Sequence, residues 1–455
     1  MLSLEGLTQV NPDGRVLPRL VDKWEWERGG LELRVFLRRN VRFHNGTALT
    51  ATLAASALEK ILARPSNRAL YPSLTDVIRV RPEGDLQLVL ELSQPSAFLP
   101  EDLSVPLQLE GDNVGTGPYR VANRDGSQVT LEKFPGYYLG SPAISKVVLK
   151  PSDALRTTWT SLLRGEVDMM MEIPPNSVEF AENENVQAIS FPHWYQFVLA
   201  LNLTKPIFHS PAVRRALNIA VDRDALVKKA LKGFGTPATG PIWPRHWAYD
   251  GSIQGFAFDP AAATSLLDGA GAREGAVPGE GFPNARLRFT CLIPRNFSLL
   301  ERLALDLQRQ FYDVGVDMQF EVVPIADYDT RIRDGKFEAV LVDMISGPTL
   351  GRPYIFWRSA KSYKGLNVFG YENTEAERSF DTLRTSMSEA GTRSATRRLQ
   401  RALLDDPPAV FLAWNVRARI IRREFQIHQE PGRDPVQSLW RWTANSNQIQ
   451  TASVQ

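Results

Sequence analysis

Residues 195–227 constrain the fold of this chain more than any other stretch of its sequence. An almost unbroken apolar run, 197–201, ends at Asn202 and predicts a strand that is covered on both faces. Ser210 and Pro211 then predict the start of a helix, because a hydroxyl can cap the first turn and proline suits the first helical position. The stretch therefore combines a buried strand with a helix that follows after a short turn.

Two helices are expected in quick succession after this strand. The first has one apolar face, because its apolar residues recur at spacings of three and four. These residues are Val213, Ala216, Leu217 and Ala220. Asp222 is expected to cap the second helix. A strand, a turn and two helices in this order predict an α/β segment.

The residues of this segment closely resemble one protein family. At the matching positions the chain carries Asn202, Pro206, Phe208, Val-Arg-Arg-Ala-Leu at 213–217 and Ala-Val-Asp-Arg at 220–223. The pattern is similar to that of the family 5 extracellular solute-binding proteins, which include the oligopeptide- and dipeptide-binding proteins of ABC importers. That family has an Asn-ending strand, Pro-Phe-x-Asp, Val-Arg-x-Ala-Leu and Ala-Ile-Asp-Arg. Ser210 stands where the family has the Asp.

Further motifs extend the resemblance from about Leu7 to the region of Trp440, nearly the whole chain. Residues 115–119 read Gly-Thr-Gly-Pro-Tyr, as in the family, and the two glycines predict backbone conformations that are closed to other residues. The resemblance implies an α/β, periplasmic-binding-protein-like fold (type II, cluster C) with two lobes and an additional small domain. The expected boundaries are 1–114 for the small domain, 115–204 with 430–455 for the first lobe, and 205–429 for the second lobe.

Composition narrows the classes of function. A net charge of +2 gives no electrostatic footprint for nucleic acid, so no nucleic-acid partner is expected. Cys291 is the only cysteine, which excludes an internal disulfide bond. No apolar run approaches the roughly 20 residues that span a bilayer.

The N-terminal residues carry no signal peptide, since they lack both a charged start and an apolar core. Members of the resembled family are mostly exported. We therefore expect a periplasmic or membrane-anchored extracytoplasmic protein, and we expect that the export signal and a first strand are missing from this chain.

No pattern of catalytic or cofactor-binding residues stands out. The five histidines are scattered, and no nucleophile elbow or cofactor fingerprint is present. His44 lies in a turn with no second metal ligand at a suitable spacing, so it is expected to be structural. The sequence therefore predicts neither an enzyme nor a cofactor or metal site.

The resemblance implies that the segments joining the two lobes line a ligand cleft. The candidate residues in them are Trp194, Tyr195, Gln196 and Asn202, with the neighbourhood of 115–117. Aromatic side chains offer a large contact area and tolerate varied ligands. For Trp194 and Tyr195, a place in the hydrophobic core is the alternative.

Two further tryptophans are candidates. Trp243 lies in a stretch that matches the family's Gly-x-x-Pro loop, which often reaches the cleft, and the alternative is that its ring clamps the loop itself. Trp414 ends an apolar run that is expected to be a buried strand, and it faces either the ligand or the core.

One departure from the resembled family bears on the ligand. Peptide binders end a strand on Trp-x-x-Asp, whose carboxylate pairs with the amino terminus of the ligand, and the register from residues 337–338 places Met344 and Gly347 there. A buried ammonium without a counter-charge is strongly destabilised, so an ordinary peptide amino terminus is disfavoured at that point. Asp343 takes this role only if the register slips or the strand twists, because a slip of one residue reverses the face.

Polar and aromatic side chains that follow this strand complete the predicted site. They are Ser346, Arg352, Trp357 and Asn367. Arg352 is suited to a two-pronged grip on a ligand carboxylate, with a surface salt bridge as the alternative. Asn367 belongs to a stretch that matches the family's Asn-x-x-x-Tyr, a segment that commonly borders the cleft.

These patterns predict a substrate-binding protein of an ABC importer that captures a small polar or peptide-like solute between two closing lobes. Its expected partners are that ligand and the membrane permease of the importer. The alternative is a cytoplasmic ligand-sensing domain of a transcription regulator with the same fold. An upstream helix-turn-helix would distinguish the regulator from the importer component.

Overall fold

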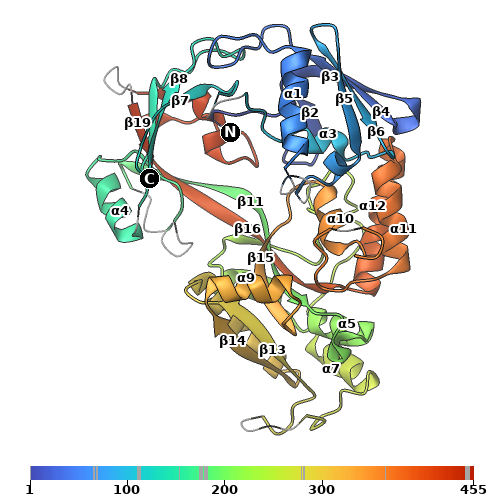
Figure 1. The fold of residues 1–455 in the computed structure, drawn as a ribbon. Coiled ribbons are helices and arrows are strands. Elements are labelled where there is room, and N and C mark those ends of the chain that lie inside the picture. The colour runs from blue at the N-terminus through green and yellow to red at the C-terminus, as the bar shows by residue number, and fades with distance from the viewer. Residues whose placement is uncertain are drawn as a thin grey trace. The chain divides into compact units, whose positions relative to one another are not determined.

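The computed structural model (Figure 1) contains two compact units, Met1–His193 with Val416–Gln455 (unit 1) and Trp194–Asn415 (unit 2). The structure describes residues 2–64, 67, 70–109, 114–152, 154–173, 178, 183–277, 279, 282–363, 365–445 and, for the backbone, 451–454. Two long strands, β11 (Val186–Leu201) and β16 (Ala409–Arg422), have residues in both units.

The two units divide the chain inside β11 and β16, whereas the predicted boundaries at 204 and 429 lie beyond these strands. The division into 1–114, 115–204 with 430–455, and 205–429 stays a prediction. Residues 110–113 and 446–450, which belong to the predicted ranges, lie outside the described part of the chain.

Unit 2 is built on a mixed sheet in the order β14-β13-β15-β11-β16, and β12 pairs with the other edge of β16. The further strands are β12 (Gly235–Pro237), β13 (Leu287–Pro294), β14 (Val316–Val323) and β15 (Ala339–Ile345). The helices are α5 (Pro211–Ile219), α6 (Arg223–Lys229), α7 (Pro260–Gly269), α8 (Ser298–Tyr312), α9 (Ile325–Arg333), α10 (Gly351–Trp357), α11 (Thr374–Thr385) and α12 (Glu389–Asp405). Figure 1 shows α11 and α12 side by side.

Unit 1 contains a four-stranded antiparallel sheet in the order β3-β4-β6-β5, and helix α1 (Ala51–Leu62) packs on it. A second group of strands follows the order β16-β10-β19-β9-β8-β7. The strands are β1 (Thr8–Val10), β2 (Val16–Pro18), β3 (Val21–Glu27), β4 (Glu32–Leu37), β5 (Val77–Glu83), β6 (Gln87–Leu92), β7 (Tyr119–Asp125), β8 (Gln128–Lys133), β9 (Lys146–Leu149), β10 (Met169–Met170), β17 (Phe425–Gln426), β18 (Thr443–Ala444) and β19 (Thr451–Val454). In its described part, this unit also contains the α-helices α3 (Leu99–Asp102) and α4 (Leu155–Leu163).

The strand and helices expected for 195–227 are confirmed. Residues 197–201 form the buried end of β11, and the predicted apolar face of α5 is buried against the core of unit 2. The Asp222 carboxylate accepts a hydrogen bond from the Ala225 backbone N–H at 2.9 Å and thereby caps α6. Removing such apolar surface from water is the main favourable term in folding.

For one helix start and one pair of glycines, the physical reason that the sequence suggested was wrong. Ser210 begins α5 with extended backbone, but its side chain accepts no capping hydrogen bond, so Pro211 with its fixed φ defines this helix start. Gly115 and Gly117 do not have positive φ angles. They are required because a Cβ on them would lie 2.2 Å from the Ser3 carbonyl oxygen and 2.6 Å from the Leu2 carbonyl oxygen, respectively.

His44 is structural, as its sequence context predicts. Its Nε2 lies 2.9 Å from the Gly117 carbonyl oxygen, and its Nδ1 accepts a hydrogen bond from the Gly115 N–H at 3.3 Å. The imidazole therefore connects the turn at 43–46 to the glycine segment within unit 1.

Candidate functional site

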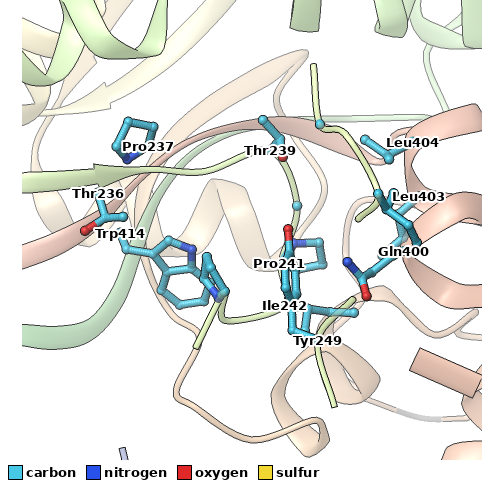
Figure 2. Close-up of a pocket in the computed structure, with 14 residues that line it drawn as sticks. Thr236, Pro237, Thr239, Pro241, Ile242, Tyr249, Gln400, Leu403, Leu404 and Trp414 are labelled. Carbon is cyan, nitrogen blue, oxygen red and sulfur yellow. The ribbon is translucent and has the colours of Figure 1, made fainter. Parts of the chain in front are cut away.

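A pocket of about 240 Å³ lies within unit 2, between the segment that contains β12, the C-terminal part of α12 and β16. Figure 2 shows Trp414 on one side of this pocket and Gln400, Leu403 and Leu404 on the other. The remaining lining residues are Thr236, Pro237, Thr239, Gly240, Pro241, Ile242, Pro244, Tyr249, Ile253 and Gly255. Side chains that are charged at neutral pH are absent from this lining.

Strand pairing and one buried amide position the wall of the pocket. Thr236 pairs with Trp414 where β12 joins β16. Gln196, which is fully buried in β11, donates a hydrogen bond from Nε2 to the Gly240 carbonyl oxygen at 2.8 Å. The predicted site residues Gln196 and Trp414 therefore both contribute to the pocket, one as a support and one as a lining residue.

Arg223, the last residue of the Ala-Val-Asp-Arg motif, also binds backbone groups of the segments that form the pocket wall. Its Nε donates to the carbonyl oxygens of Ala238 and Phe411, both at 2.7 Å, and its Nη2 donates to Asn218 Oδ1 at 2.9 Å. Burial lowers the pKa of Arg223 to about 9. An arginine stays charged in proteins, so these polar contacts offset the desolvation of a buried cation.

Arg214, the first arginine of the Val-Arg-Arg-Ala-Leu motif, has a similar structural role. Its guanidinium donates to the carbonyl oxygens of Pro407 and His209, each at 2.9 Å, and pairs with the Asp406 carboxylate. It therefore ties α5 to the start of β16. Arg214 and Arg223, the arginines of the two sequence motifs, thus support the structure around the pocket without lining it.

Two polar groups at the pocket and its support have no hydrogen-bond partner among the described residues. They are the indole Nε1 of Trp414 and the amide Oε1 of Gln196, and both atoms are buried. The exposed fraction is 1% for Trp414 and 0% for Gln196. A buried polar group without a partner costs about 1–3 kcal/mol, so these two atoms destabilise the ligand-free fold.

The pocket lining also includes two neutral polar side chains, Gln400 and Tyr249. Gln400 accepts from the Asp250 N–H at 2.9 Å and donates to the Asp250 carbonyl oxygen at 3.2 Å. Burial raises the pKa of Tyr249, so its hydroxyl stays protonated at neutral pH. The sequence analysis missed these residues. A buried Gln on the apolar face of a helix was the one available signal for Gln400.

The predicted residues at the ends of β11 and β15 come together. The Trp194 carbonyl oxygen accepts hydrogen bonds from the Ser346 and Gly347 N–H groups at 3.0 and 2.9 Å. Tyr195 pairs with Ile345 across the two strands. Gly347 has a φ of 60°, and a Cβ there would approach Arg352 Cγ at 3.2 Å, so this turn suits glycine.

Asp343 and Met344 follow the strand register without a slip. Asp343 lies opposite Phe197 and Met344 lies opposite Gln196, so their side chains point to opposite faces of the sheet. Asp343 Oδ2 accepts a hydrogen bond from Asn415 Nδ2 at 3.2 Å. The half-buried Asp343 carboxylate thus lies beside Asn415, which follows Trp414 in the chain and is the last residue of unit 2.

Three other predicted residues have structural contacts that occupy their side chains. Asn202 Nδ2 donates to the carbonyl oxygens of Gly335 and Phe337 at 3.1 and 2.8 Å, and its Oδ1 accepts from Thr204. Asn367 Nδ2 likewise donates to two backbone carbonyl oxygens at 2.9 Å. Trp357 is 1% exposed and stacks on Phe369.

Trp243 supports the pocket by packing on its lining residue Trp414. Its ring packs edge-to-face against Trp414 with a centroid distance of 4.9 Å, and it is 5% exposed. Its neighbours Ile242 and Pro244 line the pocket, whereas Trp243 does not. Trp243 therefore orients the Trp414 indole.

The described residues contain no group of three or more His, Cys, Asp or Glu side chains suited to a metal ion. In the same part of the chain, no helix combines the length and apolar character that crossing a membrane requires.

Comparison with known proteins connects the chain to one family. The sequence profile of the bacterial extracellular solute-binding proteins, family 5 Middle, matches residues 15–365. The chain is 29% identical over 333 residues to the glutathione-binding protein GsiB of Pectobacterium atrosepticum. This match covers 69% of this chain and 62% of that protein. The chain therefore spans less than two thirds of the length of the curated relatives that it matches first.

Two solved structures share the fold. NikZ from Campylobacter jejuni, in complex with Ni(L-His), is 22% identical with a TM-score of 0.81, over 97% of this chain and 94% of that one. The oligopeptide-binding protein AppA from Bacillus subtilis, in complex with a nonapeptide, is 19% identical with a TM-score of 0.78, over 97% and 93%. These similarities confirm the predicted α/β, periplasmic-binding-protein-like fold.

Proposed function

Because the chain belongs to the bacterial extracellular solute-binding proteins of family 5, we propose that it is the solute-capturing component of an ABC importer. The family is one of binding proteins, in agreement with the expectation that the chain is not an enzyme. The permease of the importer would be its membrane partner. Its place would be outside the cytoplasm, in the periplasm or anchored to the membrane.

The ligand that we propose is a small polar or peptide-like solute. Relatives of this chain are named for glutathione binding, and proteins of the same fold hold a nonapeptide or a nickel–histidine complex. Each of these ligands contains amino-acid units. The single observation that carries the proposal is the family match.

The residues that we propose for ligand contact are a subset of those expected from the sequence. They are Trp194, Tyr195, Asp343, Met344, Ser346, Gly347, Arg352 and Trp414. Gln196 and Trp243 would position this set, since one supports Gly240 and the other packs on Trp414. Asn202, Trp357 and Asn367 would maintain the surrounding structure.

Gly347 matters for the choice of ligand. In the resembled peptide binders a carboxylate stands at the matching position, and here no side chain replaces it. We propose that a free amino terminus is not held at Gly347, and that the carboxylate of Asp343, beside Asn415, receives a ligand cation. N-acetylated and free peptides of one sequence compare these two cases directly.

Native mass spectrometry of the purified protein, followed by thermal-shift screening, tests the proposed function. The panel contains glutathione, di- and tripeptides, a longer peptide, the nickel–histidine complex and, as a control class, simple sugars. A co-purified solute, or a melting temperature that rises with ligand concentration as binding linkage requires, supports the proposal. A clean protein that no panel member stabilises contradicts it.

The closing of two lobes over the solute stays a prediction. Small-angle scattering with and without a stabilising ligand measures it, because closure shortens the largest dimension of the particle. Unchanged dimensions at saturation would contradict closure while leaving solute binding intact.

A further inference from the structure

We propose that the exposed face of helix α12 is a docking surface for a bilayer that carries anionic phospholipids. This basic face consists of Arg393, Arg397, Arg398 and Arg401. The inference goes beyond solute capture, and it rests on the proposed function only in placing the protein beside the membrane of its permease.

The two faces of α12 differ in composition. One face is buried and mainly apolar. On the other face, every exposed residue between positions 391 and 404 is an arginine except Ser394. Because an α-helix turns by about 100° and rises about 1.5 Å per residue, the four arginines occupy an arc of about 140° over a length of about 12 Å. They therefore form one continuous patch.

Little of this positive charge is neutralised within the protein. Arg397 Nε pairs with the Asp250 carboxylate at 2.8 Å. Arg393, Arg398 and Arg401 have no carboxylate partner among the described residues, since Arg398 donates to hydroxyl groups and Arg393 to a backbone carbonyl oxygen. The basic face therefore presents three positive charges that an anionic partner can neutralise.

This arrangement is unfavourable for the helix itself. Arg397 lies four residues from both Arg393 and Arg401, and like charges at this spacing destabilise a helix. Asp405, one turn beyond Arg401, is exposed but forms no ion pair with it in the described part of the chain. Positions that break such a local rule are expected at functional surfaces.

Two of the arginines are held in place before a partner arrives. The Arg393 guanidinium lies over the ring of Trp247, 5.2 Å from its centroid, and Asp250 holds Arg397. Side chains that are already ordered lose less conformational entropy on binding. The half-buried Trp247 also adds an amphipathic ring beside the basic face, a residue type that is enriched at the level of lipid headgroups.

The shape and chemistry of the basic face favour one kind of partner. A guanidinium group matches phosphate oxygens with two parallel hydrogen bonds. An exposed helix face is convex, so it does not enclose a small anion and instead suits an extended surface with several phosphate groups. A bilayer with anionic phospholipids is such a surface, and each arginine close to it adds about fivefold to the affinity.

Vesicle flotation of the full chain tests the proposal. The vesicles contain phosphatidylcholine alone or phosphatidylcholine mixed with phosphatidylglycerol, which is anionic. At low ionic strength we expect binding to the mixed vesicles and not to phosphatidylcholine alone. Salt at about 0.5 M should release the protein, because it screens exposed charges.

A triple variant and a matched control locate the binding. The variant Arg393→Gln, Arg398→Gln, Arg401→Gln removes three charges that lack a carboxylate partner, so affinity for the mixed vesicles should fall about a hundredfold. The control removes the same net charge and should lose less than about threefold. It combines three exposed residues that pair with carboxylates, namely Arg120→Gln, Lys336→Gln and Arg378→Gln. Circular dichroism verifies that both variants are folded.

Each outcome decides the proposal. Equal binding to the two kinds of vesicle, no binding to the mixed vesicles, or equal losses in the triple variant and the control would overturn it. If poly-glutamate binds through the same arginines while the mixed vesicles do not, the partner is an acidic protein and not a bilayer. Thermal-shift screening separates the two proposals: vesicle binding without any solute-induced shift supports the basic face and contradicts solute capture, and the reverse result contradicts the basic face alone.

Discussion

The buried polar groups around Glu5 in unit 1 and those around Trp414 in unit 2 follow opposite rules. The Glu5 carboxylate accepts hydrogen bonds from Arg19 Nε at 2.7 Å, the Tyr137 hydroxyl at 2.9 Å and the Thr116 hydroxyl at 3.0 Å. Both of its oxygens are therefore engaged. Around Trp414, by contrast, an indole N–H and an amide oxygen remain without a described partner.

The pKa shifts in unit 1 agree with a closed structural network. Burial alone would lower the pKa of Arg19, but the Glu5 carboxylate outweighs it and the pKa is raised above the usual value. Burial and the same carboxylate raise the pKa of Tyr137. Arg19 and Tyr137 thus stay protonated throughout the physiological range, as donors to one carboxylate.

The contrast separates two kinds of buried polar group by their effect on stability. Where each buried donor meets an acceptor, the polar network holds the backbone together. Where buried donors and acceptors are left over, the folded state carries a free-energy cost. The Arg223 guanidinium belongs to the groups that meet acceptors, although it lies in unit 2, close to the groups that are left without a described partner.

Loss of a closed set should produce the largest effect. Arg223→Met removes the donor to the Ala238 and Phe411 carbonyl oxygens and to Asn218, and buried acceptors lose their partner. Each acceptor left unsatisfied costs about 1–3 kcal/mol, so we expect about 4 kcal/mol less stability, measured by urea denaturation. Arg215→Met, on the exposed face of the same segment, is the control and should change stability by less than about 0.5 kcal/mol.

The second largest effect is expected at Glu5 in unit 1. Glu5→Gln keeps the shape but leaves Arg19 without its counter-charge. The loss should be about 3 kcal/mol in the transition of unit 1. Glu25→Gln removes an exposed partner of Lys23 and should have almost no effect. Equal losses in the two variants would mean that burial does not separate these ion pairs.

A matched pair of aromatic substitutions sharpens the comparison between the two kinds of group. Tyr137→Phe deletes a hydroxyl that donates to Glu5 and should cost about 1–2 kcal/mol. Trp414→Phe deletes an N–H that donates to no described residue, so the ligand-free protein should lose less than about 1 kcal/mol. Thermal unfolding of both variants without ligand measures the difference. A larger loss for Trp414→Phe would contradict the proposed distinction.

The smallest expected effect depends on pH. Burial, with the positive charges of Arg417 and Arg419, lowers the pKa of His193 from 6.5 to about 4. Between pH 6.5 and 4, His193 is therefore protonated in the unfolded chain and neutral in the folded chain. The contribution of His193 to the free energy of unfolding is complete above pH 6.5 and is lost as pH falls towards 4. Since the ring is only partly buried, we expect about 1 kcal/mol. His193→Gln should flatten this part of the stability profile in urea titrations.

The sequence was sufficient for the elements in 195–227 because local patterns determine them, and the fold followed from the family resemblance. Apolar periodicity predicts α5, and Asp222 caps α6 as expected. The motif arginines Arg214 and Arg223 have a packing role that only the structure reveals, since their acceptors lie up to 193 residues away.

The pocket was beyond prediction for the same physical reason. Its lining combines residues 236–255, the end of α12 and Trp414, and no local pattern relates these segments. Trp414, Trp243 and Gln196 were expected near a ligand from the resemblance, yet whether each lines, supports or positions the pocket depends on packing. Asn202 and Asn367 had the side-chain type of ligand residues, but nearby backbone groups occupy their amides.

The most direct test of the distinction between closed and open polar sets is the indole ¹H–¹⁵N NMR signal of Trp414, assigned by its loss in Trp414→Phe. In the ligand-free protein this signal should lie at high field, because hydrogen bonding deshields an indole proton and the Trp414 N–H has no described acceptor. A Trp414 signal at the low field of hydrogen-bonded indoles would contradict the claim that its N–H is left without a partner.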